Sequence, residues 1–241
     1  MVGRSASGSV RPMDRVIALI PGYQEGPRIG PVVAAAARHL PVVVVDDGST
    51  DDTGARAADA GATVIRQVPN QGKGAALREG FRHVLAAGAE AVVTLDADGQ
   101  HDPAEIPRFL EAFEAIETFA AGRPELVIGR RDFRQMPIVR RLSNTVGGLV
   151  FSAAVGQRIP DNQSGYRLIG RPLMTALLES SEDGFAFEVE MIASCIALDL
   201  PIAWVPIATI YAGEPSHIRP VRHFTSFLAA TRKARRIVRG G

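Results

Sequence analysis

The sequence predicts an α/β protein whose mainly parallel sheet carries helices on both faces. Between residues 16 and 131, short runs rich in β-branched residues alternate with Ala-rich stretches that are long enough for helices. The runs are apolar at every position instead of every second one, which indicates strands buried on both faces. Polar clusters follow four of these runs, at the edge where such sheets bind ligands.

The expected elements follow in order along the chain. The runs expected to form strands are 16–20, 42–45, 62–65, 91–95 and 125–128. The stretches expected to form helices after them include 31–39, 52–60, 74–87 and 104–121. The second half is less regular, with helical segments expected at 138–156, 171–180 and 187–199 around the segment DNQSGYRLIG. The run IAWVPIATI is expected to form one further strand.

One large domain is expected, because the pattern continues without a long polar linker. Residues 1–15 are rich in Gly, Ser and Arg and are expected to form a disordered tail. Residues 16–218 are expected to form the domain, and residues 219–241 a basic amphipathic helix. No signal-peptide pattern begins the chain, and the apolar stretch 145–156 is too short to cross a bilayer. We therefore expect a cytoplasmic protein, either soluble or peripheral on the cytoplasmic membrane face.

The composition agrees with a globular protein that has no nucleic-acid partner. The chain is 46% hydrophobic and 22% charged, and its net charge is only +1. The single cysteine, Cys195, lies in an apolar stretch and cannot form a disulfide within the chain. A buried, reduced thiol is expected there, as is usual in a reducing cytoplasm.

The first acidic cluster of interest follows the second apolar run. Asp46 and Asp47 end four consecutive valines, and Gly48 then permits a tight turn into a helix. Helix capping accounts for the residues that follow, Ser49 to Asp51, but not for the two strand-end acids. An unpaired acid at this position is costly, so we expect Asp47 to serve a ligand.

A glycine-bearing loop, NQGKGAAL, leads into the next expected helix and contains Lys73. It resembles a phosphate cradle, although no Ser or Thr follows the lysine as in a P-loop, and a plain loop explains it equally well. The dinucleotide pattern GxGxxG is absent after the first run, where PGYQE stands instead. Its absence argues against a nicotinamide-dependent dehydrogenase.

The stretch VVTLDADGQHD, residues 92–102, places Asp96 and Asp98 directly after a buried run. Two nearby carboxylates repel each other unless a positive group lies between them. Hard divalent cations bind carboxylate and amide oxygens, and Asp96, Asp98 and the Gln100 carbonyl could supply part of such a shell. The alternative is a solvated acidic turn. Polar clusters also follow the other expected strands, which favours the metal site.

Taken together, the ordered motifs resemble family 2 glycosyltransferases of the GT-A fold, whose Rossmann-like sheet binds a nucleotide sugar. The similarity covers about residues 16–215 and is greatest to the dolichol- or polyprenyl-phosphate mannosyl- and glucosyltransferases. The segments that carry it are IPGYQE, VVDDGSTDDT, NQGKGAALREGF, LDADGQHDP, DNQSGYRL and FEVEM. The resemblance implies an inverting transfer of a hexose from a GDP- or UDP-hexose, with Mg or Mn as the divalent metal.

The resemblance also implies roles for individual residues. Those matching the donor-binding motifs are Pro21, Tyr23, Glu25, Asp47, Lys73, Asp96, Ala97 and Asp98. Those matching the metal motif are Asp96, Asp98 and Gln100. Those placed near the acceptor are Arg130, Arg131, Arg167 and Ser216. The chain departs mildly from the family pattern at Gly22 and Gln24, where Ala and Asn are usual.

The acceptor decides which catalytic group is needed. A lipid phosphate is already an anion, so it needs arginines to position it and no base. A sugar hydroxyl needs a carboxylate base, for which Asp161 and Glu188 are the candidates. Four arginines, Arg130, Arg131, Arg140 and Arg141, favour polyprenyl phosphate. The expected catalytic residues are therefore Asp98 and Arg131, with Asp161 as the base in the alternative.

Two other classes of protein agree less well with the sequence. A nucleotidyltransferase also combines such a sheet with acidic metal ligands, but a glycine-rich basic loop is expected after its first strand, and PGYQEG is not one. A nucleotide-sugar sensor without activity is less consistent with a full set of metal and donor motifs.

The last segment, HFTSFLAATRKARRIVRGG, begins at His223 and combines apolar and basic residues. Its apolar residues can fall near one face of a helix: Phe224, Phe227, Leu228, Ile237 and Val238. Its basic residues occupy the remainder: Arg232, Lys233, Arg235, Arg236 and Arg239. Such a helix can lie in an anionic headgroup layer or pack its apolar stripe on the domain, and the sequence leaves both open.

Overall fold

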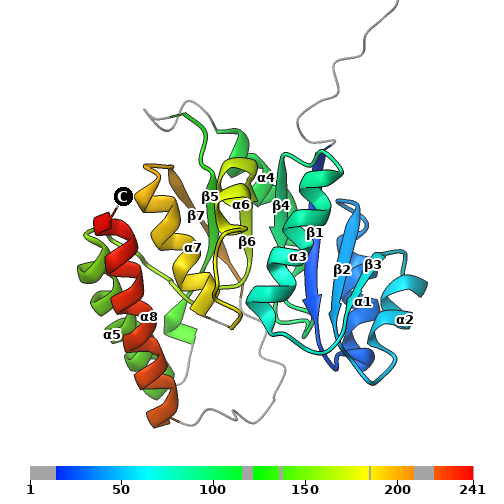
Figure 1. The fold of residues 1–241 in the computed structure, drawn as a ribbon, viewed down its shortest axis with the longest axis horizontal. Coiled ribbons are helices and arrows are strands. Elements are labelled where there is room, and N and C mark those ends of the chain that lie inside the picture. The colour runs from blue at the N-terminus through cyan, green and yellow to red at the C-terminus, as the bar shows by residue number, and fades with distance from the viewer. Residues whose placement is uncertain (1–14, 116–121, 136–137, 185, 209–219, 241) are drawn as a thin grey trace, which may run out of the picture.

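A seven-stranded sheet forms the centre of the molecule (Figure 1). The computed structural model describes residues 15–115, 122–135, 138–184, 186–208 and 220–240. The strands are β1 (Val16–Gly22), β2 (Val42–Asp47), β3 (Thr63–Gln67), β4 (Ala91–Thr94), β5 (Leu126–Arg131), β6 (Arg167–Gly170) and β7 (Ile202–Ile207). Their order across the sheet is β3-β2-β1-β4-β6-β5-β7.

The sheet is mainly parallel, as predicted, but contains one antiparallel strand. Strands β1, β2, β3 and β4 pair in parallel, and β5 pairs in parallel with β7. Strand β6 lies antiparallel between β4 and β5. It comes from the segment DNQSGYRLIG, for which the sequence predicted no strand, since four residues that begin with arginine carry almost no strand signal.

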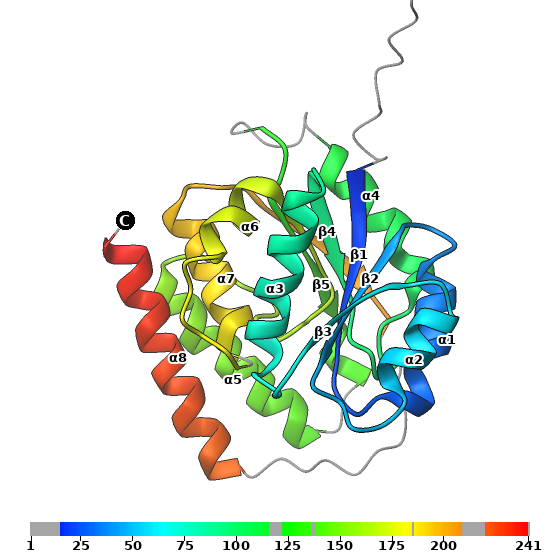
Figure 2. The same cartoon turned by 45° about the vertical axis from the view of Figure 1, so that its right-hand side comes forward.

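The helices cover both faces of this sheet (Figure 2). They are α1 (Gly26–Ala36), α2 (Thr53–Asp59), α3 (Lys73–Ala86), α4 (Ile106–Glu114), α5 (Ile138–Val155), α6 (Arg171–Leu177), α7 (Ala186–Ala197) and α8 (Pro220–Gly240), with short 3-10 turns η2 (Pro103–Glu105) and η4 (Phe133–Gln135). Helix α1 begins at Gly26, earlier than the start predicted at residue 31. A proline in its first turn favours the earlier start.

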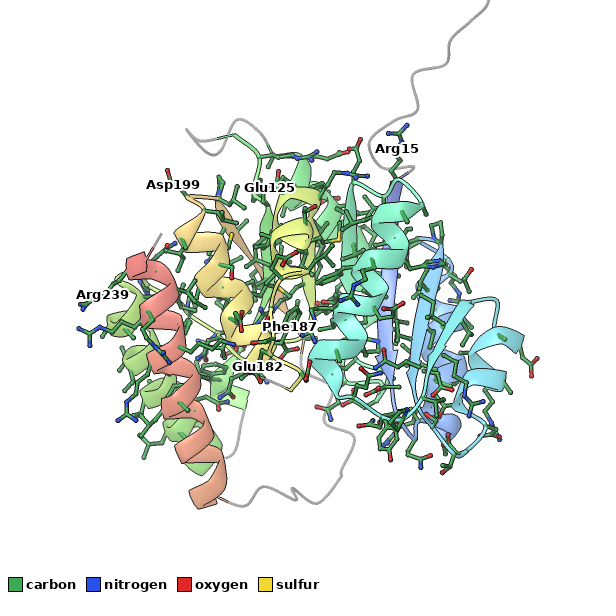
Figure 3. All side chains as sticks on the ribbon, viewed as in Figure 1. Arg15, Glu125, Glu182, Phe187, Asp199 and Arg239 are labelled. Carbon is green, nitrogen blue, oxygen red and sulfur yellow. The ribbon has the colours of Figure 1, made fainter. Side chains whose placement is uncertain are left out.

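Two separate apolar cores lie on the two faces of the sheet, and side chains fill the space between sheet and helices (Figure 3). In β2, Val43 and Val45 point into the core beneath α3, α6 and α7, while Val42 and Val44 point into the core beneath α1, α2 and α4. This alternation explains why every position of the run is apolar.

Helix α8 packs against the domain through its apolar side. Phe227, Ala230, Ile237 and Val238 adjoin the core beneath α7, and Ala234 is fully part of it. On the α7 side of α8, Lys233 forms ion pairs with Glu182 and Glu190. The sequence left open whether the apolar stripe of this helix packs on the domain or lies in a membrane, and in the structure the stripe packs on the domain. No helix among the described residues is both long and apolar enough to cross a membrane.

Candidate active site

A pocket of about 370 Å³ opens where β1, β2 and β4 end and α3 begins. Its lining residues are Pro21, Gly22, Tyr23, Glu25, Asp47, Asn70, Gly72, Lys73, Ala76, Asp96, Ala97 and Asp98. All eight residues that the sequence placed at the donor are among them. They meet because the carboxyl ends of parallel strands share one edge of the sheet.

The turn after β1 is held to the turn after β2 by Gln24. This residue adopts a left-handed conformation, with φ of 58°. Its backbone N–H donates to Ser49 Oγ at 3.0 Å, and its side-chain amide donates to Thr50 Oγ1 at 2.8 Å. Next to it, the backbone N–H of Glu25 donates to Thr53 Oγ1 at 2.8 Å. Gln24, where the family usually has Asn, thus connects the turns after β1 and β2 beside the pocket.

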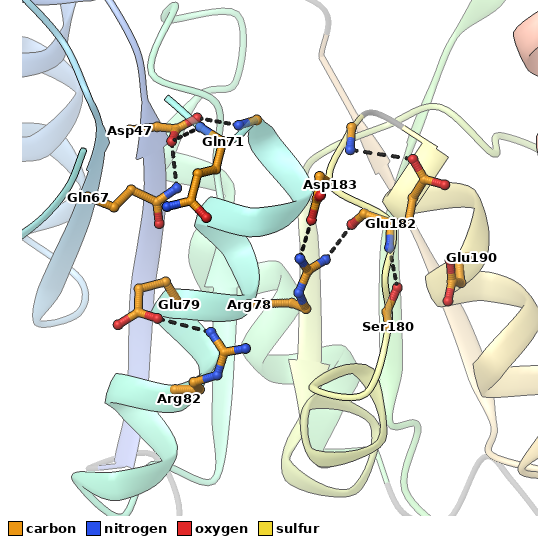
Figure 4. A network of polar contacts seen from close by, with 12 residues as sticks. Asp47, Gln67, Gln71, Arg78, Glu79, Arg82, Ser180, Glu182, Asp183 and Glu190 are labelled. Carbon is orange, nitrogen blue, oxygen red and sulfur yellow. Dashed lines mark hydrogen bonds and ion pairs between the residues drawn. The ribbon is translucent and has the colours of Figure 1, made fainter. Parts of the chain in front are cut away.

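Asp47 is not the unpaired acid that the sequence analysis assumed. Its carboxylate accepts hydrogen bonds from Gln67 Nε2 at 2.5 Å and Asn70 Nδ2 at 2.9 Å. It also accepts bonds from the backbone N–H groups of Gln71 and Gly72, both at 2.8 Å (Figure 4). Asp47 therefore lines the pocket and also fixes the loop that leads to Lys73.

A partly buried three-residue charge cluster forms the floor of the site. Lys73 Nζ lies 2.5 Å from Asp96 Oδ1 and 2.7 Å from Glu188 Oε1. Burial opposes the charge on Lys73, but the two carboxylates outweigh it and raise the pKa of the lysine. Burial likewise opposes the charge on Asp96, and Lys73 overcomes it, lowering the pKa of Asp96 to about 2. At neutral pH the cluster carries one net negative charge.

Gly165 lies directly against this cluster. A Cβ atom there would come within 2.8 Å of Glu188 Oε1 and 3.0 Å of both Asp96 Oδ2 and Lys73 Nζ. A side chain at this position would press on the three charged groups, so the glycine leaves room for the cluster. In the sequence this glycine stands out only as part of the motif SGYRL, which predicts no role for it.

His101 is a second residue that the sequence analysis quoted without a role. Its Nδ1 accepts a hydrogen bond from the backbone N–H of Asp96 at 3.1 Å, and its ring lies 5.0 Å from that of Tyr166. Burial, only partly offset by Asp96, lowers the pKa of this imidazole. His101 is thus neutral, with its proton on Nε2, and it orients the end of β4 where Asp96 stands.

The carboxylates of the pocket fit a divalent cation held partly by a ligand. Asp96 and Asp98 both line the pocket, and the cluster and Asp98 together carry two negative charges. Among the described residues no group of three or more His, Cys, Asp or Glu side chains could hold a metal. The remaining positions would fall to phosphate and water, as is usual for Mg²⁺. Gln100 is exposed and outside the lining, and the ligand role expected for its carbonyl stays a prediction.

The glycines of NQGKG serve packing within the protein. A Cβ atom at Gly72 or Gly74 would come within 2.5 Å of a carbonyl oxygen of the loop 180–184. The N–H groups of Gly74 and Ala75 donate to the Asp183 carbonyl at 2.8 and 3.4 Å. Arg78 also binds this loop, through Asp183 and the Glu182 carbonyl (Figure 4). Because these two N–H groups of α3 bind the protein itself, they do not favour the interpretation of this loop as a phosphate cradle.

The residues proposed for the acceptor separate in the structure. Arg131 and Asp161 form a two-point ion pair, with Nε–Oδ2 at 2.8 Å and Nη2–Oδ1 at 2.9 Å. Neighbouring strand residues point to opposite faces, so Arg130, which is exposed, points away from this pair. Ser216 lies outside the described residues, as does the Arg140 side chain.

Arg167 is a buried structural residue in this arrangement. Its side chain is 1% exposed and donates to the carbonyls of Ser164 at 2.7 Å, Glu188 at 2.5 Å and Asn162 at 3.4 Å. These bonds fix the 162–164 segment against the start of α7. The predicted contact between Arg167 and an acceptor therefore needs a correction: the guanidinium binds main-chain carbonyls and does not reach the surface.

An acidic pocket at the carboxyl edge of a mainly parallel, helix-covered sheet defines the molecule as an α/β protein with a ligand site at its strand ends. Comparison with family models makes the class specific. Residues 17–175 match Glycosyl transferase family 2, so the chain belongs to this family and is a glycosyltransferase.

Curated relatives agree with the family. The chain is 32% identical over 211 residues to the undecaprenyl-phosphate mannosyltransferase of Micrococcus luteus, covering 81% of this chain and 84% of the relative. It is 30% identical to the polyprenol monophosphomannose synthase of Mycolicibacterium smegmatis, covering 83% and 78%.

Solved structures agree with the fold. Glucosyl-3-phosphoglycerate synthase of Mycobacterium tuberculosis, in complex with Mn²⁺, UDP-glucose and phosphoglyceric acid, superposes with a TM-score of 0.69. The match covers 91% of this chain and 79% of that one at 21% identity. The predicted GT-A fold is confirmed.

Proposed function

We propose that the protein transfers a hexose from a nucleotide diphosphate sugar to a polyprenyl phosphate, with inversion at the anomeric carbon and with a divalent metal. The pocket supports the donor, since its position at the strand ends suits a nucleotide and its carboxylates suit the divalent metal that would carry the diphosphate. The acceptor class follows from two relatives, which are named for transfer to undecaprenyl phosphate and for the synthesis of polyprenol monophosphomannose.

One observation carries the choice of a phosphate acceptor. Both carboxylates that could act as base for a hydroxyl acceptor are already bound to cations, Asp161 to Arg131 and Glu188 to Lys73. A base must reach the proton that it removes, and both groups would first have to leave their partners. A phosphate oxygen is already ionised at neutral pH and needs no base. The arrangement therefore favours an anionic acceptor.

The residues of the chain take separate parts in the reaction. Asp96 and Asp98 would hold the metal, which when bound neutralises charge on the departing diphosphate. Lys73 fixes Asp96, while His101 orients its backbone. Arg131, aligned by Asp161, would position the acceptor phosphate. The acceptor oxygen then bonds to the anomeric carbon as the bond from that carbon to the diphosphate oxygen breaks.

The experiment is a panel of GDP- and UDP-hexoses with polyprenyl phosphate or simple glycosides as acceptors, read by product mass. We expect a hexosyl phosphate lipid from one donor and no product from glycosides. The variant Asp98→Ala tests the metal site. It removes a proposed metal ligand without removing core volume, so it should abolish transfer with the fold intact. Products from glycosides alone would overturn the acceptor. Full activity of Asp98→Ala in chelator-treated buffer would overturn the metal site.

A further inference from the structure

Helix α5 exposes an unusual amount of apolar surface on one side. The side chains of Leu142 and Leu149 are 64% and 67% exposed, and those of Val146 and Val150 are also exposed. The spacing of these four residues, which we call the α5 ridge, places them along one side of the helix. The opposite side is buried, with Phe151 in the core. Among the described residues, seven large hydrophobic side chains are exposed, and four of them lie here.

Helix α8 lies beside α5 and presents a row of exposed arginines. Both views of the fold show the two helices side by side, and a Cβ atom at Gly147 of α5 would lie 3.6 Å from Phe227 of α8 (Figures 1 and 2). Among the side chains of α8 from Phe227 onward, the exposed basic ones are Arg232, Arg235, Arg236 and Arg239. Figure 3 shows Arg239 pointing outward at this end of the molecule.

The charge of this surface has one sign. Neither α5 nor α8 contains an aspartate or glutamate. The acids paired with Lys233, Glu182 and Glu190, belong to α7 and the loop before it, on the other flank of α8. Two further exposed arginines, Arg141 within α5 and Arg158 after it, add to the positive charge. An apolar ridge with exposed arginines on its own helix and along the neighbouring one matches the interface of an anionic lipid bilayer.

We propose that the α5 ridge and the α8 arginines form a docking surface for an anionic membrane. The ridge enters the headgroup layer, and the arginines bind lipid phosphates around it. The apolar part thus comes from α5, because the apolar stripe of α8 is occupied by the domain. A second copy of the chain is a poorer occupant, since a symmetric contact through this face would bring the two arginine rows together.

This surface deepens the proposed function, because a polyprenyl phosphate acceptor resides in a membrane. Helix α5 follows β5 in the chain and begins at Ile138, soon after Arg131 at the end of that strand. Docking through α5 would therefore bring the bilayer toward the side of the site where Arg131 and Asp161 stand. The binding assay below contains neither donor nor acceptor, so its failure and the failure of the transferase proposal are distinguishable.

The test is co-sedimentation of the full chain with vesicles of phosphatidylglycerol and phosphatidylcholine in equal parts, or of phosphatidylcholine alone. We expect binding to the anionic vesicles that weakens with salt. Leu149→Asp should weaken vesicle binding about tenfold or more, since the variant lacks a leucine that would be buried in the headgroup layer on docking. Arg236→Glu should weaken it about fivefold or more, the equivalent of about 1 kcal/mol for each lost basic residue.

Two control variants make the same chemical changes elsewhere. Leu198→Asp alters a leucine that is 49% exposed at the end of α7, and Arg38→Glu alters an exposed arginine beside α1. Both should bind vesicles like the unchanged protein, with circular dichroism confirming that all four variants are folded. The proposal is overturned if no vesicle binds the full chain, or if the control variants lose binding equally.

Light scattering across protein concentrations tests the competing occupant. If the chain forms a dimer that Leu149→Asp dissociates, the ridge is a subunit interface and the membrane proposal is wrong. A monomer that binds anionic vesicles through the ridge supports it.

Discussion

Replacing either partner of the ion pair between Arg131 and Asp161 should destabilise the protein, but by different amounts. The Asp161 side chain is 1% exposed, whereas that of Arg131 is 21% exposed. Replacing Arg131 with methionine leaves a buried carboxylate without its cation. Replacing Asp161 with asparagine leaves a guanidinium that water can still reach. We therefore expect Arg131→Met to destabilise the protein more than Asp161→Asn.

The magnitudes follow from the contacts. Breaking a buried pair from one side costs about 3–5 kcal/mol. Asp161 would retain the backbone N–H groups of Arg131 and Gln163, at 3.3 and 3.1 Å, so we expect the lower end of that range for Arg131→Met. For Asp161→Asn, which keeps the shape and leaves a partly hydrated cation, we expect about 1–2 kcal/mol. At about 2–4 °C per kcal/mol for a chain of this size, the two melting points should be clearly separated.

The assay combines denaturant unfolding, followed by circular dichroism, with acceptor and donor kinetics. Asp161→Asn should raise the KM for the acceptor and leave the donor KM unchanged, because Asp161 aligns Arg131. Loss of a general base would instead lower kcat about 10²–10⁴-fold at unchanged KM. Arg134→Met, in the exposed pair with Asp132, is the control and should leave the unfolding midpoint unchanged. Equal destabilisation by Arg131→Met and Asp161→Asn would refute the reasoning from burial.

Three other outcomes are expected. Asp47→Asn should weaken nucleotide binding about tenfold or more in titration calorimetry, because the Asp47 carboxylate holds the loop before Lys73. Hydrogen bonds to a charged group contribute about 1.5–3 kcal/mol each. Unchanged nucleotide affinity would contradict this role of Asp47. Gly165→Ala should abolish most transfer by displacing Glu188, and wild-type rates would show that the cluster tolerates the added methyl group. Burial raises the pKa of Cys195 to about 12, so the thiol should resist alkylation in the folded protein. Because the unfolded thiol ionises near pH 8.5, stability should fall as the pH rises from about 8.5 toward 12, and less steeply in Cys195→Ala.

Much of the fold and of the pocket lining could be predicted from local sequence. Continuous apolar runs such as the four valines of β2 require burial on both faces, and that requirement alone predicts a helix-covered, mainly parallel sheet. In such a sheet the polar residues after β1, β2 and β4 must meet at one edge. Tyr23, Asp47 and Asp98 were therefore predictable members of one site.

Which partner each charged residue takes was decided by the tertiary structure. Lys73 and Glu188, like Arg131 and Asp161, are far apart in the chain, and no local periodicity encodes their contact. The same holds for Arg167, whose place in the family motif gave no sign that its guanidinium binds buried carbonyls.

The strand β6 and the side on which α8 packs were likewise decided by long-range contacts. Four residues of β6 form a strand because β4 and β5 already flank them, and the apolar stripe of α8 is buried because α7 presents a matching surface. Local sequence determines which surfaces a segment must bury, whereas the rest of the chain determines what covers them.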